Sequence, residues 1–78
     1  MIKYLLLKLA EEAGEVVVAA IKHRLHRTDA TRRELEGEIA DLSGIVRILV
    51  DEFELDTQRM DKLSNQRKQR ELKRAKGR

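Results

Sequence analysis

Hydrophobic residues recur every three or four positions along most of this chain, which is the spacing of an amphipathic α-helix. At about 100° per residue, the apolar positions of residues 2–26 fall on one stripe. Its members are Ile2, Leu5, Leu6, Leu9, Ala13, Val16, Val17 and Ala20. A second helical stripe consists of Leu35, Ile39, Leu42, Ile45, Val46, Leu49 and Phe53. The pattern therefore predicts two helices, the first over residues 2–26.

Polar residues between the stripes predict where these helices end. The last turn of the first helix carries Lys22, Arg24 and Arg27, cations that suit the negative end of the helix dipole. Residues 28–30 are predicted to form the connection. The run 31–34, Thr-Arg-Arg-Glu, has the capping-box pattern and predicts the start of a second helix that reaches about Glu54. A connection this short makes neighbouring helices antiparallel.

The composition changes abruptly near the C-terminus. Residues 62–78 carry eight Lys or Arg against one acid, a local charge of +7 that leaves −4 on residues 1–61. Asp56 is placed to cap a third helical segment. We therefore divide the chain into a helical core, residues 1–61, and a basic C-terminal helix or tail, residues 62–78. We expect the helix to fray or become disordered toward 76–78.

The predicted fold class is all-α: an antiparallel helical hairpin plus a C-terminal helix. Proline is absent and glycine is rare, as expected for such a chain. Because 78 residues arranged this way bury little apolar surface, we expect a homo-oligomer, dimer or tetramer, with a four-helix-bundle-like core. The faces expected to meet from two chains are those of Leu5, Leu9 and Val16 and of Leu42, Ile45 and Leu49.

The absence of cysteine bears on the compartment and on the kinds of site available. Without cysteine the chain has neither a disulfide framework nor a thiolate zinc site, so the cytoplasm is the expected location. The apolar stretch 2–9 is interrupted by Lys3 and Lys8 and is too short to span a bilayer. We expect no membrane partner.

Four acidic residues form the candidate site. Glu12 and Glu15 are spaced i, i+3 on the first helix, and Glu38 and Asp41 have the same spacing on the second. Glu12 falls at the edge of its apolar stripe, and Glu38 falls inside its own. A carboxylate that faces a core loses hydration worth several kcal/mol, so it must be paired, protonated or metal-bound. The hairpin brings the two pairs together, and the pattern predicts a divalent-metal site.

A less specific interpretation applies to other charged residues. Charged side chains make up 40% of the chain, so an ExxE pattern also arises on ordinary solvated faces. We expect solvated or ion-paired faces at Glu11, Glu34, Glu36, Asp51 and Glu52. His23 and His26 share a helical face, but no third ligand is near them in the pattern, which favours a solvated or helix-capping role.

The order of the two acidic motifs resembles a known enzyme family. ExxE within residues 8–16, a spacer, and ExxD within residues 38–42 are similar to the signature of the MazG-like all-α nucleoside triphosphate pyrophosphohydrolases. The similarity covers about residues 5–55. It implies hydrolysis of a nucleoside triphosphate, with a deoxynucleotide expected, to monophosphate and pyrophosphate for control of nucleotide pools.

The same resemblance assigns roles to residues. Glu12, Glu15, Glu38 and Asp41 would hold Mg²⁺, with Mn²⁺ as a substitute, and either Glu12 or Glu15 would also orient or deprotonate the attacking water. Lys62, Asn65 and Arg67 loosely match the residues with which the family contacts substrate phosphates. Relatives commonly have a helix before the ExxE helix that helps to frame the base. Here the aromatic residues are only Tyr4 and Phe53, so we expect that pocket to be incomplete or supplied by another subunit.

Three alternatives remain open at the level of sequence. Phosphoribosyl-ATP pyrophosphohydrolase shares the acid layout, although the residues after the second acid pair match that branch less well. A non-enzymatic module that contacts nucleic-acid phosphates would use the basic tail, although the tail lacks aromatic residues for base stacking. An inactive helical oligomerisation module derived from the enzyme is the third, and the intact set of four acids argues against it.

Overall fold

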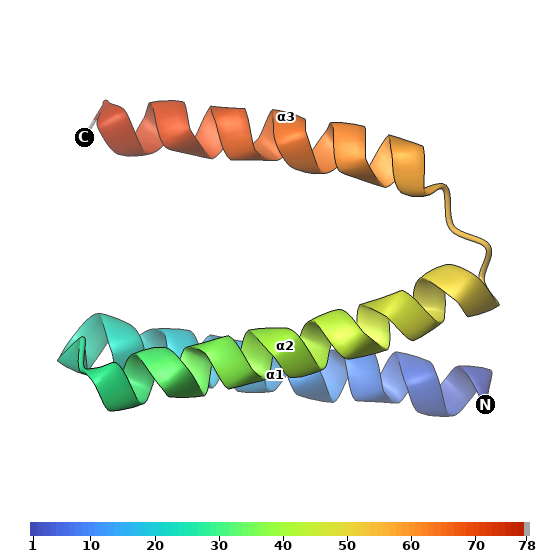
Figure 1. The fold of residues 1–78 in the computed structure, drawn as a ribbon, viewed down its shortest axis with the longest axis horizontal. Helices are drawn as coiled ribbons and strands as arrows, with labels where there is room; N and C mark the ends of the chain where they lie inside the picture. Colours follow the sequence, from blue (N-terminus) through green and yellow to red (C-terminus); the bar gives the residue numbers. More distant parts are fainter. Residues whose placement is uncertain (78) are drawn as a thin grey trace.

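The computed structural model describes residues 1–77, and these form three α-helices with no strand among them. In chain order they are α1 (Ile2–His26), α2 (Asp29–Glu52) and α3 (Thr57–Lys76). Helices α1 and α2 lie side by side and antiparallel, and α3 runs back at a distance from them (Figure 1). The predicted all-α class, the bounds of the first helix and the antiparallel hairpin are confirmed. Nowhere in residues 1–77 is a helix long and apolar enough to cross a membrane.

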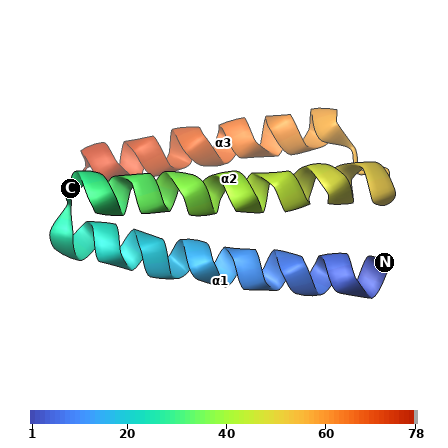
Figure 2. The same cartoon turned by 60° about the horizontal axis from the view of Figure 1, so that its bottom comes forward.

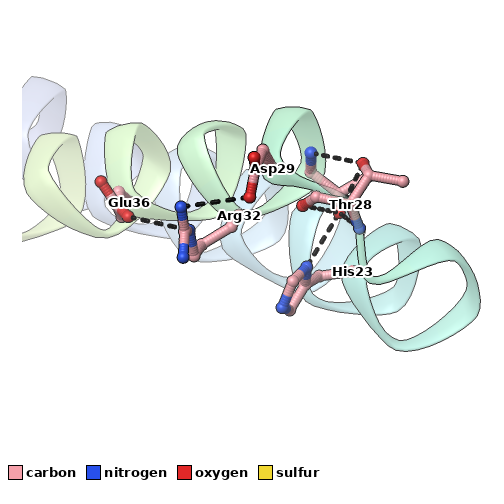
Figure 3. A network of polar contacts seen from close by, with 6 residues as sticks. His23, Thr28, Asp29, Arg32 and Glu36 are labelled. Atoms are coloured by element: carbon pink, nitrogen blue, oxygen red, sulfur yellow. Dashed lines mark hydrogen bonds and ion pairs between the residues drawn. The ribbon is translucent and has the colours of Figure 1, made fainter.

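Two threonines determine where α2 begins. The Thr28 hydroxyl accepts a hydrogen bond from the Thr31 backbone N–H at 3.1 Å, and the Thr31 hydroxyl accepts one from the Thr28 N–H at 3.0 Å. This reciprocal pair is a capping box with Thr28 as the N-cap, and Figure 3 shows it at the loop end of the hairpin. The predicted box over residues 31–34 was wrong by three residues, because a second threonine performs the role expected of Glu34.

The end of α2 also differs from the sequence pattern. Glu54 has a φ of 50°, in the left-handed region, and the Leu55 N–H donates to the Val50 carbonyl at 3.0 Å. This is a helix-ending Schellman motif, and a left-handed residue cannot continue a right-handed helix. The helix therefore stops at Glu52, before the expected Glu54. Beyond it, Asp56 caps α3 as predicted, since its carboxylate accepts from the Arg59 N–H at 3.0 Å.

Helices α1 and α2 meet along a seam with alternating steps of three and four residues, the pattern of a coiled coil. Its buried side chains are Leu5, Ala19 and Leu49, which are 4%, 1% and 5% exposed. The other seam positions are half-buried. On α1 they are Leu9, Glu12, Val16 and His23, and on α2 they are Thr31, Leu35, Glu38, Leu42 and Ile45.

The seam is narrower than the predicted stripes. Ile2, Leu6 and Val17 on α1 and Ile39 on α2 are each about half exposed, because one neighbouring helix covers only a narrow strip of its partner. Ala19, which the predicted stripe omitted, is the most deeply buried residue of α1. The two faces expected to meet from different chains, around Leu5 and Leu49, close against each other within one chain. An interchain core would therefore use other residues.

Helix α3 does not pack along the hairpin. All of its residues are exposed, and Figure 1 shows it running back at a distance from the α1–α2 pair, although the two overlap in the turned view of Figure 2. The Cα radius of gyration is 14.8 Å, whereas a compact chain of this length would have about 11.5 Å. Within α3, Glu71 pairs with Arg67 and Arg74. The helix continues through Lys76, further than expected, and the expectation for Arg78 lies outside the described residues.

The small core makes a direct prediction for stability. Leu49→Ala should lower the free energy of unfolding by about 2–5 kcal/mol, because it removes most of a buried side chain from the seam. Leu25→Ala is the matched control, since Leu25 is 70% exposed, and it should change the free energy by less than about 0.5 kcal/mol. Urea denaturation followed by circular dichroism measures both. Equal losses for the two variants would contradict the seam.

Candidate metal centre

The register of the hairpin places two acids in adjacent layers of the seam. His23 Nδ1 lies 2.8 Å from the Thr31 hydroxyl, which fixes the pairing at the loop end (Figure 3). In an antiparallel pair, each step back along α1 is a step forward along α2. Val16 is therefore opposite Glu38, and Glu12 is opposite Leu42. The two seam acids thus lie about one helical turn apart on facing helices.

Three carboxyl groups converge at this point. Oxygen atoms of Glu12, Glu15 and Glu38 all lie within 4.8 Å of one another. Glu15 joins the two seam acids from the flank of α1, where its side chain is exposed. Asp41, the fourth acid of the predicted site, is exposed on the corresponding flank of α2 and lies outside this cluster of three. We refer to Glu12, Glu15 and Glu38 as the acid cluster.

One carboxyl oxygen of each seam acid is left without a hydrogen-bond partner. Glu12 Oε2 and Glu38 Oε2 are both shielded from solvent, and neither has a hydrogen-bond partner within the described part of the chain. A buried oxygen in this state has lost its water without regaining a hydrogen bond, which is unfavourable for a carboxylate. Residues 1–77 also contain no ion pair between a Lys or Arg and any member of the acid cluster. Within residues 1–77 the negative charge of the cluster is therefore not balanced by an ion pair.

Mutual repulsion and burial shift the titration of these acids upward. The pKa of Glu12 is raised, first by burial and then by the nearby charges of Glu15 and Asp41. The pKa of Glu38 is raised, first by hydrogen bonding to the Glu15 carboxyl group and then by burial and the neighbouring acids. Asp41 thus acts electrostatically on both seam acids, although it is not part of the cluster.

Three cations of the hairpin are engaged by acids outside the cluster. Lys8 Nζ lies 3.0 Å from a carboxylate oxygen of Glu11, and Lys22 Nζ lies 3.0 Å from one of Glu34. Figure 3 shows Arg32 between Asp29 and Glu36 in the same way. The expected ion-paired faces are confirmed for Glu11, Glu34 and Glu36. Lys8, Lys22 and Arg32 are therefore paired with acids outside the acid cluster.

The donor set of the cluster fits a hard divalent cation. Carboxylate oxygens are the ligands preferred by Mg²⁺ and Mn²⁺, and the two partnerless oxygens point to a ligand from outside the chain. A bound cation would supply the charge that the cluster lacks and would lower the raised pKa values. The three clustered acids therefore fit the predicted metal, and Asp41 is close enough to contribute electrostatically.

A pocket of about 330 Å³ opens beside the cluster. Its lining includes Glu15 and Glu38 together with residues that the sequence analysis did not select, namely Glu11, Gly14, Val18 and Glu34. The signal for these residues was present in the helical period, since all four project toward the same flank of the hairpin as Glu15. No atom lies within 4 Å of the Cβ position at Gly14, so a larger side chain would fit there without a clash.

The predicted phosphate contacts lie on a separate element. Lys62, Asn65 and Arg67 belong to α3, are exposed, and are not brought to the acid cluster within this chain. Arg67 instead pairs with Glu71 at 3.0 Å. At about 100° per residue, Arg67 points roughly 140° away from Lys62, so the two side chains face different sides of α3.

The two histidines have separate environments. His23 is half-buried and bridges the helices through Thr31, a role in the hairpin interface that the sequence analysis missed. Its position one heptad after Val16 was the available signal. His26 is exposed. Neither belongs to a cluster of potential metal ligands in residues 1–77.

Comparison of the chain with protein-family models, curated proteins and solved structures finds no match. The functional interpretation therefore depends on the acid spacing and on the geometry described above.

The raised pKa values predict how stability depends on pH. Because folded Glu12 and Glu38 hold their protons more tightly than the unfolded chain does, stability falls as pH rises through their folded-state pKa. Without divalent metal, Glu38→Gln should therefore be more stable than the wild type at neutral pH. The advantage should shrink as pH falls through the raised folded-state pKa, and it should be absent below the ordinary glutamate value of 4.5, where the wild-type carboxyl is protonated in both the folded and the unfolded chain.

Urea unfolding at neutral pH and at a pH below 4.5, with a chelator present, measures the difference in stability between Glu38→Gln and the wild type. Glu52→Gln is the control, because Glu52 is an exposed acid on the same helix away from the cluster. A Glu38→Gln variant that is less stable than the wild type at neutral pH would show that the Glu38 carboxylate has a favourable partner.

Proposed function

We propose that this chain is a MazG-like metal-dependent nucleoside triphosphate pyrophosphohydrolase. The observation that carries the proposal is the acid cluster: three carboxylates within 4.8 Å, two with buried oxygen atoms that have no partner. Acids placed in a helical seam destabilise the chain that contains them. Such a loss of stability is characteristic of functional sites, where charged groups are held in position to bind a ligand.

Glu12, Glu15 and Glu38 would hold Mg²⁺, with Asp41 beside them as the fourth acid. A cation held there would supply positive charge that neutralises the triphosphate oxygens and would favour deprotonation of water. Glu12 and Glu38 lie in the seam on facing helices, so packing fixes their positions relative to each other. Fixed positions of the carboxylates would suit Mg²⁺, which tolerates less variation in its ligands than Ca²⁺ does.

Glu15 is the better placed of the two acids proposed to act on water. It is exposed and lines the pocket, whereas Glu12 faces the seam and does not line it. A carboxylate at the pocket edge can accept a proton from the water that attacks the α-phosphorus. The bond from that phosphorus to the bridging oxygen then breaks, and the products are the nucleoside monophosphate and pyrophosphate. We therefore assign the positioning of water to Glu15.

The substrate would approach along the acidic flank, with its triphosphate toward the cluster. The pocket is at the lower end of the roughly 300–1,000 Å³ typical of ligand sites, so it accommodates only part of a nucleotide. The remaining contacts would come from a homo-oligomer, dimer or tetramer, in which α3 of one chain brings Lys62, Asn65 and Arg67 to the site of another. The local charge of +7 on residues 62–78 supports a role with anionic phosphates.

A second function is favoured by one observation. Helix α3 is exposed along its length and strongly basic, which suits contact with nucleic-acid phosphates. Such binding would weaken steeply with salt and would not need the acid cluster. The negative charge of residues 1–61 opposes the binding of nucleic acid. This function would also not explain why two acids are placed unfavourably in the seam. We therefore rank it below the enzyme.

Nucleotide hydrolysis is the direct test of the proposed activity. Incubation of a panel of nucleoside triphosphates with Mg²⁺ should release monophosphate and pyrophosphate, separated by chromatography. Glu38→Gln and Asp41→Asn should abolish release, because each removes negative charge that the cation requires. Glu36→Gln should retain it, since Glu36 pairs with Arg32 away from the cluster.

Phosphoribosyl-ATP should be included in the same panel. If it is the only compound cleaved, the chain is a phosphoribosyl-ATP pyrophosphohydrolase instead. Wild-type turnover in the Glu38→Gln variant would remove Glu38 from the proposed site. Absence of pyrophosphate from every nucleotide would reject the pyrophosphohydrolase.

Thermal stability gives an independent measure of metal binding. Millimolar Mg²⁺ should raise the melting temperature, because a ligand that binds only the folded chain stabilises it by mass action. The rise should be lost in Glu12→Gln and retained in Glu52→Gln, with ionic strength held constant by a monovalent salt. A melting temperature that does not change with Mg²⁺ would count against the site whatever the substrate.

A further inference from the structure

The pocket beside the acid cluster is strongly acidic, which opposes the entry of an anionic substrate. Its lining includes four carboxylates, those of Glu11, Glu15, Glu34 and Glu38. A divalent cation carries two positive charges, fewer than the three carboxylates of the acid cluster, so it does not also offset the charge of a triphosphate. A triphosphate bound there therefore requires a further cation at the pocket.

Lys22 lies at this pocket and links the two helices. Its Nζ atom is 3.0 Å from Oε1 of Glu34, an acid of the pocket lining. In the register of the seam Glu34 is opposite Ala20, so the Lys22 side chain runs back along α1, toward the pocket, to reach it. At about 100° per residue, Lys22 also lies within about 20° of Glu15 around α1. The ammonium group is thus at the loop end of the pocket, on the same flank as the acid cluster.

The Lys22–Glu34 ion pair is weak enough to be exchanged for a phosphate. The two side chains are 50% and 41% exposed, and an ion pair in contact with water contributes little to stability. Lys8 differs, since its Nζ atom lies 3.0 Å from Glu11 of the same helix and 5.7 Å from the centre of the Tyr4 ring. Lys8 is therefore held by an aromatic ring as well as by an acid, whereas Lys22 pairs with Glu34 across the open flank.

We propose that Lys22 exchanges Glu34 for the terminal phosphate of a metal-bound nucleoside triphosphate, and so fixes the direction in which the substrate lies along the hairpin. This inference rests on the proposed hydrolase function. Glu34 and Glu38 are four residues apart on α2, so the ammonium group is about one helical turn, roughly 6 Å, from the acid cluster along the helix. A triphosphate whose α-phosphorus lies at Glu15 extends over that distance to its terminal phosphate.

This placement puts the charge of Lys22 where negative charge develops during the reaction. Water attacks the α-phosphorus and gives its proton to Glu15, and the bond to the bridging oxygen breaks, so that its electron pair leaves with pyrophosphate. The ammonium group lies beside the leaving pyrophosphate and stabilises that charge. The nucleoside consequently points toward the N-terminal end of α1, where Tyr4 continues the same flank.

Binding of substrate analogues tests this contact apart from turnover. The first probe is the α,β-methylene analogue of the triphosphate that the wild type cleaves fastest, and the second is the corresponding α,β-methylene diphosphate, which lacks the terminal phosphate. Calorimetry in Mg²⁺ should show that Lys22→Gln binds the triphosphate analogue about 10- to 100-fold more weakly than the wild type, because a hydrogen bond between charged groups is lost. Binding of the diphosphate analogue should change by less than about threefold.

Lys8→Gln is the matched control, because it removes the same charge from the other end of the flank. It should leave the preference for triphosphate over diphosphate intact. Lys22→Arg should retain most of the preference, since a cation remains, whereas a merely structural role of Lys22 would weaken the binding of both analogues.

Glu34→Gln approaches the exchange from the other side. It releases Lys22 from its partner and should tighten binding of the triphosphate analogue more than binding of the diphosphate analogue. That gain in preference should vanish when Glu34→Gln is combined with Lys22→Gln, because the released cation is then absent.

Loss of the triphosphate preference in Lys22→Gln, but not in Lys8→Gln, establishes the contact. Equal losses in the two variants, or equal weakening of both analogues in Lys22→Gln, overturn it, and the hydrolase proposal then stands on the turnover of the wild type. A wild type that cleaves no triphosphate rejects the hydrolase and, with it, this assignment of Lys22.

Discussion

Desolvation of two carboxylates is the constraint around which this molecule is built. Glu12 and Glu38 occupy seam positions where a coiled-coil pattern favours apolar side chains, and each has a buried oxygen without a partner. The apolar contacts that hold the seam together lie toward its ends, where Leu5 and Leu49 are buried on one side and Ala19 on the other. Apolar contacts therefore hold the two helices together on both sides of the region where the acids repel one another. These contacts keep Glu12 and Glu38 in place, although the acids themselves do not stabilise the seam.

Charge is segregated around the hairpin as a result. The acidic flank carries the cluster, its pocket and the ion pairs of Lys8 and Lys22, whereas the other flank is apolar. Helix α3 carries a large positive charge and lies apart. The three surfaces therefore differ in chemistry: one is acidic, one apolar and one basic. A chain of this size thus presents three chemically distinct surfaces without a large core of its own.

Periodicity alone was sufficient to place α1, because its apolar positions and terminal cations agree on the same bounds. It also placed Glu12 and Glu38 at the interface, since the angle of a residue around a helix follows from its number. Periodicity did not show which apolar residues of α1 face α2 and which face outward. That depends on how much of the α1 surface the neighbouring helix covers. The Thr28–Thr31 box and the left-handed Glu54 were missed because they depend on local pairing and backbone geometry. The path of α3 depends on contacts that its own sequence does not specify.

The position of Glu12 and Glu38 has a consequence for evolution and engineering. A leucine or valine at either position would complete the apolar seam, so mutations that strengthen the fold are close at hand and lie within the proposed site itself. Selection for heat resistance alone would reach these substitutions early and would yield a more robust hairpin with no acid cluster. Retention of the two glutamates in a laboratory lineage would then report selection for a property other than folding. Stability screens on this scaffold should therefore hold both codons fixed.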